Sequence, residues 1–119
     1  MHTTSKRVVI TGLGAITPVG NTAAEFWQSL TNGVSGIGPI TRFDATDFTT
    51  RIAGEVKDFE PTQYIDKKEA KRMDRVTQFA VAATSMAIED AALDLEKEDL
   101  ERIGTVIGTG IGGIDTLHD

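Results

Sequence analysis

Two short apolar runs, each ending in a cluster of glycines, limit most strongly what this chain can fold into. Residues 7–21 read RVVITGLGAITPVGN, and residues 103–113 read IGTVIGTGIGG. Both runs are continuously apolar rather than alternating, which is typical of strands covered on both faces of a sheet. The sequence therefore predicts strands over residues 7–12 and 103–107. With helices between them, they indicate the α/β class.

Local signals predict the elements between these two runs. Thr22 and Glu25 form a capping box at the start of a helix that stops at Asn32–Gly33. A longer helix is expected from Asp74, because apolar residues recur at helical spacing, at Val76, Phe79, Ala80, Ala83, Met86, Ala87 and Ala91. We expect the other segments to be a loop over 33–50, a short strand over 51–56, a helical turn over 62–65, a short helix capped by Asp66, and an acidic surface segment over 93–100.

Composition excludes several kinds of site. The chain of 119 residues has no cysteine, so disulfides, thiolate metal sites and a cysteine nucleophile are absent from it. Its net charge of −6 disfavours nucleic-acid binding. His2 and His118 lie beside the termini and are poor candidates for an acid, a base or a metal ligand. No run approaches the roughly 18 apolar residues of a membrane span, and no signal core is present, so we expect a cytoplasmic protein.

The second glycine cluster formally matches a dinucleotide-binding fingerprint at Gly108, Gly110 and Gly113. That fingerprint also needs a helix for the pyrophosphate and an acidic residue about 20 positions later. Only six residues follow Gly113, so a dinucleotide-binding domain is the weakest hypothesis. The alternative is that the glycines allow sharp turns and close packing at strand ends. Valine at Gly12 or Gly108 is then expected to destabilise the fold more than a surface change does.

A cluster of cations stands out on this acidic chain, and it has two interpretations. Its members are Lys67, Lys68, Lys71, Arg72 and Arg75. If the segment is helical, Lys68, Lys71 and Arg72 share a face. The simpler interpretation is a solvated helix face with intrahelical ion pairs. The sharper one is a docking site for an acidic partner that is steered by charge.

Taken together, these segments resemble the N-terminal part of the β-ketoacyl-acyl carrier protein synthases, the condensing enzymes with a thiolase-like fold. The synthase II branch is the most similar. The resemblance runs in the same order across essentially the whole chain. It is carried by RVVITGLGAITPVGN, SGI at 35–37, RFD at 42–44, AGEVKDFEP at 53–61, KKEAKRMDRVTQFA at 67–80 and RIGTVIGTGIGG at 102–113.

The resemblance implies that residues 1–119 form part of the first half of a layered αβαβα sandwich. A portion of this kind is expected to expose sheet edges and apolar helix faces. The implied activity is that of an acyltransferase of type II fatty acid biosynthesis. It condenses an acyl thioester with malonyl-acyl carrier protein, with decarboxylation, and needs no metal, nicotinamide or flavin. The family uses a cysteine nucleophile and two histidines, which are expected beyond Asp119. This chain would then hold no catalytic residue and be inactive alone.

Two sets of residues take a role from the resemblance. Lys68, Lys71 and Arg72 match positions that contact the acidic acyl carrier protein. Ile111 matches a position that lines the acyl pocket near the interface of a homodimer, where side-chain bulk limits chain length. A competing hypothesis is a non-catalytic module that retains only the docking of the carrier protein.

Overall fold

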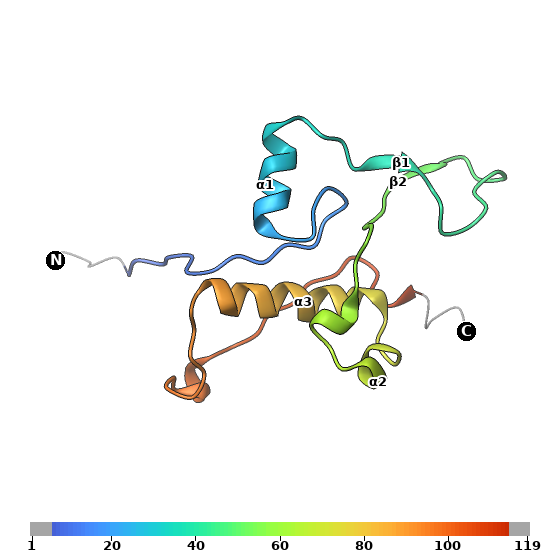
Figure 1. The fold of residues 1–119 in the computed structure, drawn as a ribbon. Helices are drawn as coiled ribbons and strands as arrows, with labels where there is room; N and C mark the ends of the chain where they lie inside the picture. The colour runs from blue at the N-terminus through green and yellow to red at the C-terminus, as the bar shows by residue number, and fades with distance from the viewer. Residues whose placement is uncertain (1–5, 115–119) are drawn as a thin grey trace.

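The long helix α3 (Arg75–Asp90) crosses the middle of the molecule, and the other elements are arranged around it (Figure 1). The computed structural model describes residues 6–114. In chain order the elements are α1 (Ala23–Thr31), β1 (Ile37–Pro39), β2 (Ile52–Gly54), the 3-10 helix η1 (Pro61–Gln63), α2 (Lys67–Ala70), α3 and the 3-10 helix η2 (Leu100–Arg102). This mixture of helices and strands is consistent with the predicted α/β class.

The helices begin where their capping residues predict. At α1, the hydroxyl of Thr22 accepts a hydrogen bond from the N–H of Glu25 at 3.1 Å. The Glu25 carboxylate accepts in return from the N–H of Asn21 at 2.8 Å, one residue earlier than in the usual capping box. The end of α1 is also confirmed, because Gly33 follows it with a positive φ of 67°. Asp66 starts α2 by accepting from the N–H of Lys68 at 2.8 Å.

The two strands form one antiparallel pair, and one of them lies where the sequence predicts a loop. Ile37 pairs with Gly54, Gly38 with Ala53 and Pro39 with Ile52. β2 confirms the short strand expected within residues 51–56, whereas β1 corrects the loop expected over 33–50. The sequence hides β1 because glycine and proline are rare in strands. Pro39 has no N–H to donate, but β1 is an edge strand, and the side of an edge strand that faces away from its partner needs no donor.

The two apolar runs that frame the chain are not strands in the described structure, so the predictions over 7–12 and 103–107 are wrong here. Their side chains face outward. Val8 is 95% exposed, Ile10 82% and Val106 98%. A strand forms only when a neighbour accepts and donates its ladder hydrogen bonds. Within residues 6–114 neither run has such a neighbour.

The chain is more open than a compact protein of its size. Its radius of gyration is 18.0 Å, against about 13.5 Å expected for 119 residues. Its accessible surface is 10126 Å², against about 6300 Å² for a compact monomer of this mass. The buried hydrophobic residues among those described are Ala45, Ile65, Ala70 and Ala82. The expectation of exposed apolar faces is therefore confirmed.

The first glycine cluster packs tightly against the second half of α3. A Cβ at Gly14 would overlap the carbonyl oxygen of Ala83, and one at Gly12 would lie 2.7 Å from the backbone nitrogen of Ala91. Between them, the N–H of Leu13 donates to the Asp90 carboxylate at 2.8 Å. Close packing therefore explains this cluster. Gly108 differs, because a Cβ there would meet no atom within 4 Å and its φ is not positive. The described structure therefore gives no steric reason for the destabilisation predicted for valine at Gly108, and that effect stays a prediction.

Candidate functional site

The predicted docking residues lie on α2 and on the turn that follows it (Figure 1). Lys68 is inside the helix, Lys71 caps its C-terminal end with helical backbone angles, and the N–H of Arg72 donates to the carbonyl of Glu69 at 2.9 Å. All three side chains are exposed. None of the three forms an ion pair with another residue of the described part of the chain. The solvated face is confirmed, and the intrahelical ion pairs of the simpler interpretation are not found.

A single side chain braces this cluster against α3. The amide nitrogen of Gln78 donates to the carbonyl of Ala70 at 2.9 Å and to that of Met73 at 3.3 Å. Ala70 itself is buried. The Ala70 carbonyl also accepts from the N–H of Met73 at 3.3 Å, so Gln78 adds side-chain hydrogen bonds to the end of α2 and to the turn that follows it. The backbone that carries Lys71 is therefore tied to the first turns of α3.

Arg75 is half-buried and packs against other elements, so it does not belong to the exposed cluster. Its guanidinium lies 4.9 Å from the ring centroid of Phe79 and 5.8 Å from that of Phe59, and it donates to the carbonyl of Val56 at 3.1 Å. Burial lowers the pKa of Arg75 from its usual value, and the positive charge of Arg42 lowers it further. The contacts with the two rings and the carbonyl make Arg75 a structural cation that joins α3 to the segment after β2.

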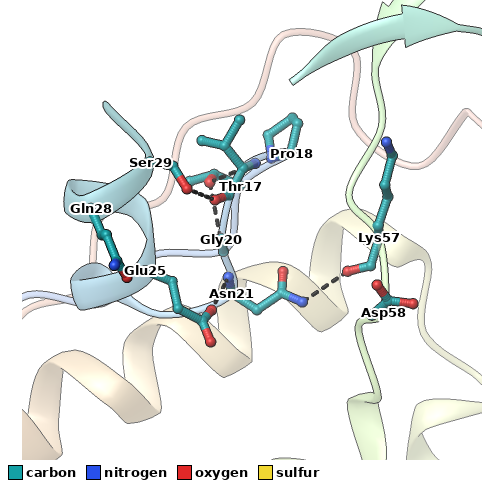
Figure 2. Close-up of a pocket in the computed structure, with 10 residues that line it drawn as sticks. Thr17, Pro18, Gly20, Asn21, Glu25, Gln28, Ser29, Lys57 and Asp58 are labelled. Carbon is teal, nitrogen blue, oxygen red and sulfur yellow. Dashed lines mark hydrogen bonds between the residues drawn. The ribbon is translucent and has the colours of Figure 1, made fainter. Parts of the chain in front are cut away.

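A cavity of about 430 Å³ lies beside the first turn of α1 and is lined in part by the turn over residues 17–21 (Figure 2). In its wall the side-chain amide of Asn21 donates to the carbonyl of Lys57 at 2.8 Å. The hydroxyl of Ser29 donates to the carbonyl of Val19 at 2.6 Å. These bonds join the turn to α1 and to the segment after β2. Among the described residues, the Asn21 side-chain oxygen is buried and accepts no hydrogen bond.

Ile111 lies in the second glycine cluster and is 73% exposed. The next residue, Gly112, has a positive φ of 81°. Gly113 lies directly against the carboxylate of Asp74 at the start of α3. The cluster is therefore a turn seated on α3. No strand precedes it within the described residues, so the dinucleotide fingerprint lacks the strand that it requires.

A metal site and a membrane-spanning helix each require a particular arrangement of residues. Across residues 6–114, no group of three or more histidine, cysteine, aspartate or glutamate side chains is placed to hold a metal ion. The sequence contains no cysteine. No helix in this range has the length and apolar character needed to cross a membrane.

Comparison with known proteins identifies the family. A family model described as the N-terminal domain of beta-ketoacyl synthase matches residues 5–119. The chain belongs to the β-ketoacyl synthase family. This confirms the resemblance that the sequence motifs carry.

Individual members of the family are similar over nearly the whole chain. The 3-oxoacyl-[acyl-carrier-protein] synthase 2 of Synechocystis sp. is 60% identical over 114 residues, which cover 96% of this chain and 27% of that protein. The protein of the same name from Staphylococcus aureus (strain COL) is 49% identical and also matches 96% of this chain, but only 28% of its own length. The chain thus spans just over a quarter of the length of these curated relatives.

Two solved structures share the arrangement of the elements. The ishigamide ketosynthase/chain length factor is 43% identical, has a TM-score of 0.67 and covers 74% of this chain and 22% of its own. A type II PKS ketosynthase, solved with its acyl-carrier protein, is 28% identical with a TM-score of 0.71, covering 95% of this chain and 32% of its own. The fold described above is therefore that of a segment of a ketosynthase.

Proposed function

We propose that the chain is the N-terminal portion of a 3-oxoacyl-acyl carrier protein synthase of the synthase II type. The observation that carries this proposal is the identity of 60% and 49%, over 96% of the chain, to two relatives of that name. The complete enzyme would be an acyltransferase of fatty acid biosynthesis. In it, residues 1–119 would supply part of the first half of a thiolase-like αβαβα sandwich. The TM-score of 0.71 to a ketosynthase supports this placement.

The chemistry of such an enzyme requires groups that this chain lacks. An acyl chain passes to a cysteine thiolate, and the carbanion formed by decarboxylation of malonyl-acyl carrier protein attacks the resulting thioester. With no cysteine, residues 1–119 cannot carry the acyl group. We therefore expect the purified chain to give no 3-oxoacyl product from acyl- and malonyl-acyl carrier protein. Measurable turnover by the pure chain would overturn this division of roles.

The contribution proposed for this chain is to dock the acyl carrier protein. Lys68, Lys71 and Arg72 are exposed cations without ion-pair partners among the described residues, on a backbone held by Gln78. An acidic partner would be attracted to such a cluster at long range and oriented by it. The absence of a cysteine also keeps a purely non-catalytic docking module as the second candidate function.

A charge-matched pair of variants tests the docking role. Lys71→Glu and Lys97→Glu each change the net charge of −6 by the same amount. Lys97 follows the C-terminal end of α3, whereas α2 precedes the N-terminal end of that helix. We expect Lys71→Glu to weaken the binding of acyl carrier protein several-fold, measured by NMR titration, and to reduce its dependence on salt. Lys97→Glu should bind almost as the unaltered chain does. If both variants weakened the binding of acyl carrier protein equally, the net charge of the chain, and not the cluster of Lys68, Lys71 and Arg72, would attract the partner.

We further propose that Ile111 lines the acyl pocket of the complete, homodimeric enzyme. Its exposure of 73% leaves the side chain available to a neighbouring subunit or an acyl chain. Bulk at such a position limits the length of acyl chain that fits. In the complete enzyme, Ile111→Ala should shift the products towards longer chains and Ile111→Phe towards shorter ones. An unchanged distribution for both variants would exclude this role.

A further inference from the structure

Asp74 and Gly113 meet at the point where α3 begins. A Cβ at Gly113 would overlap the carboxylate of Asp74 and would lie 3.1 Å from the Asp74 Cβ. The contact therefore requires glycine at this position. The carboxylate does not cap α3, because the Asp74 side chain makes no capping hydrogen bond to that helix. Its place against the glycine turn needs another explanation than helix capping.

This contact joins the two regions that the proposed function uses. Asp74 follows Arg72 of the docking cluster by two residues, and Ile111 precedes Gly113 by two residues. The turn between Arg72 and Asp74 is braced by Gln78, which donates to the carbonyls of Ala70 and Met73. A displacement of α2 would therefore also displace Asp74, because closely packed groups transmit movement to their neighbours.

The glycine turn also has room to move. A cavity of about 220 Å³ is bounded by Arg42 and the first residues of α3, from Asp74 to Val76, on one side and by the segment 112–114 on the other. Gly112 holds a left-handed backbone conformation, with a φ of 81°. The open space beside the turn leaves room for it to shift without a clash against α3. Such an element can connect two sites.

We propose that Asp74 is a positioning residue that seats the glycine turn 110–113 on α3 and so couples Ile111 to the carrier-protein docking turn at Lys71 and Arg72. The proposal rests on the proposed function, from which both ends of the link take their roles. Coupling of this kind is reciprocal, so an acyl chain at Ile111 would in turn alter the affinity of the docking face.

The first test uses the chain without a partner. Amide chemical shifts and hydrogen exchange are compared between Asp74→Ala and Asp66→Ala, which removes the capping aspartate of α2. Asp74→Ala should alter the amides of Gly112, Gly113 and Ile111, whereas Asp66→Ala should alter only those of α2. Asp74→Asn, which keeps the volume of the side chain, should restore most of the original pattern. An unaltered glycine turn in Asp74→Ala would overturn the positioning role.

The second test adds acyl carrier protein and observes both ends of the link. Shifts at Lys68, Lys71 and Arg72 report docking, and the methyl signals of Ile111 report coupling. We expect Asp74→Ala to dock with a Kd within about twofold of the original, because Asp74 lies outside the docking face, but to lose the response at Ile111. Docking with an equal Ile111 response in both proteins, or with none in either, would refute the coupling. Absence of docking in both would refute the proposed function, and the first test would still decide the role of Asp74.

Discussion

Replacing Gly12 by alanine tests the close packing of the first glycine cluster against α3. The new methyl group would overlap the carbonyl oxygen of Ala87 and lie 2.7 Å from the nitrogen of Ala91. Those two atoms form one of the last hydrogen bonds of the helix, at 3.0 Å, so moving them apart to make room for the methyl group would break that bond. Overpacking of this kind costs about 1–3 kcal/mol. Alanine also lowers the conformational entropy of the unfolded chain, which stabilises the folded state by about 0.4–1 kcal/mol. We therefore expect a net loss of about 1–2 kcal/mol.

Gly108→Ala is the matched control, because it makes the same chemical change in open space. It should be neutral or stabilise by up to about 1 kcal/mol. The two variants should thus differ by about 2 kcal/mol, which is a factor of about 30 in the unfolding equilibrium. Urea unfolding followed by circular dichroism measures the difference, and hydrogen exchange at the Ala91 amide locates it. Equal stability of the two variants would refute the packing argument.

Three further predictions concern single interactions. Thr22→Ala should destabilise the chain by about 1 kcal/mol in thermal unfolding, because the N–H of Glu25 loses its acceptor; an unchanged melting temperature would show that Glu25 alone secures this helix end. The hydroxyl and N–H of Thr41 donate to Glu55 and lower the pKa of that carboxyl. The stabilisation of the fold by ionised Glu55 should be complete above the ordinary glutamate pKa, about 4.3, and should disappear as the pH falls through the lowered pKa. Thr41→Val should make the free energy of unfolding depend less on pH in this range, and an unaltered pH dependence would contradict the role given to Thr41. Arg75→Lys should destabilise the chain despite keeping the charge, because lysine lacks the planar guanidinium that faces two rings; stability equal to that of Arg75 would show that charge alone matters.

Local sequence signals predicted the helices well. Thr22 and Asp66 each begin a helix through a hydrogen bond that spans two or three residues, and Gly33 ends one with a left-handed turn. Such contacts depend only on neighbours along the chain. The pairing of β1 with β2 depends on residues 13 to 17 positions apart, which short-range patterns do not specify.

In the candidate site, too, some features follow from local sequence and others depend on residues far apart along the chain. The charge and exposure of Lys68, Lys71 and Arg72 could be predicted from the sequence, because lysine and arginine side chains are rarely buried without a partner. The separation of Arg75 from this cluster could not be predicted. It follows from two aromatic rings and a carbonyl that approach from other elements. The contact between Asp74 and Gly113 joins residues 39 positions apart and has no signal in either motif.

The sequence by itself determined the family, the helices and the absence of a cysteine, because these depend on residue identity and on neighbours within a few positions. Only the tertiary structure decided what the two glycine-ended runs do. Both predict strands, yet within the described residues neither has a partner to complete its hydrogen bonds. The glycines at 12 and 14 bring the backbone onto α3, whereas Gly113 meets Asp74 at the other end of that helix. The same residue type in similar motifs therefore serves two different contacts, and spatial neighbours alone distinguish them.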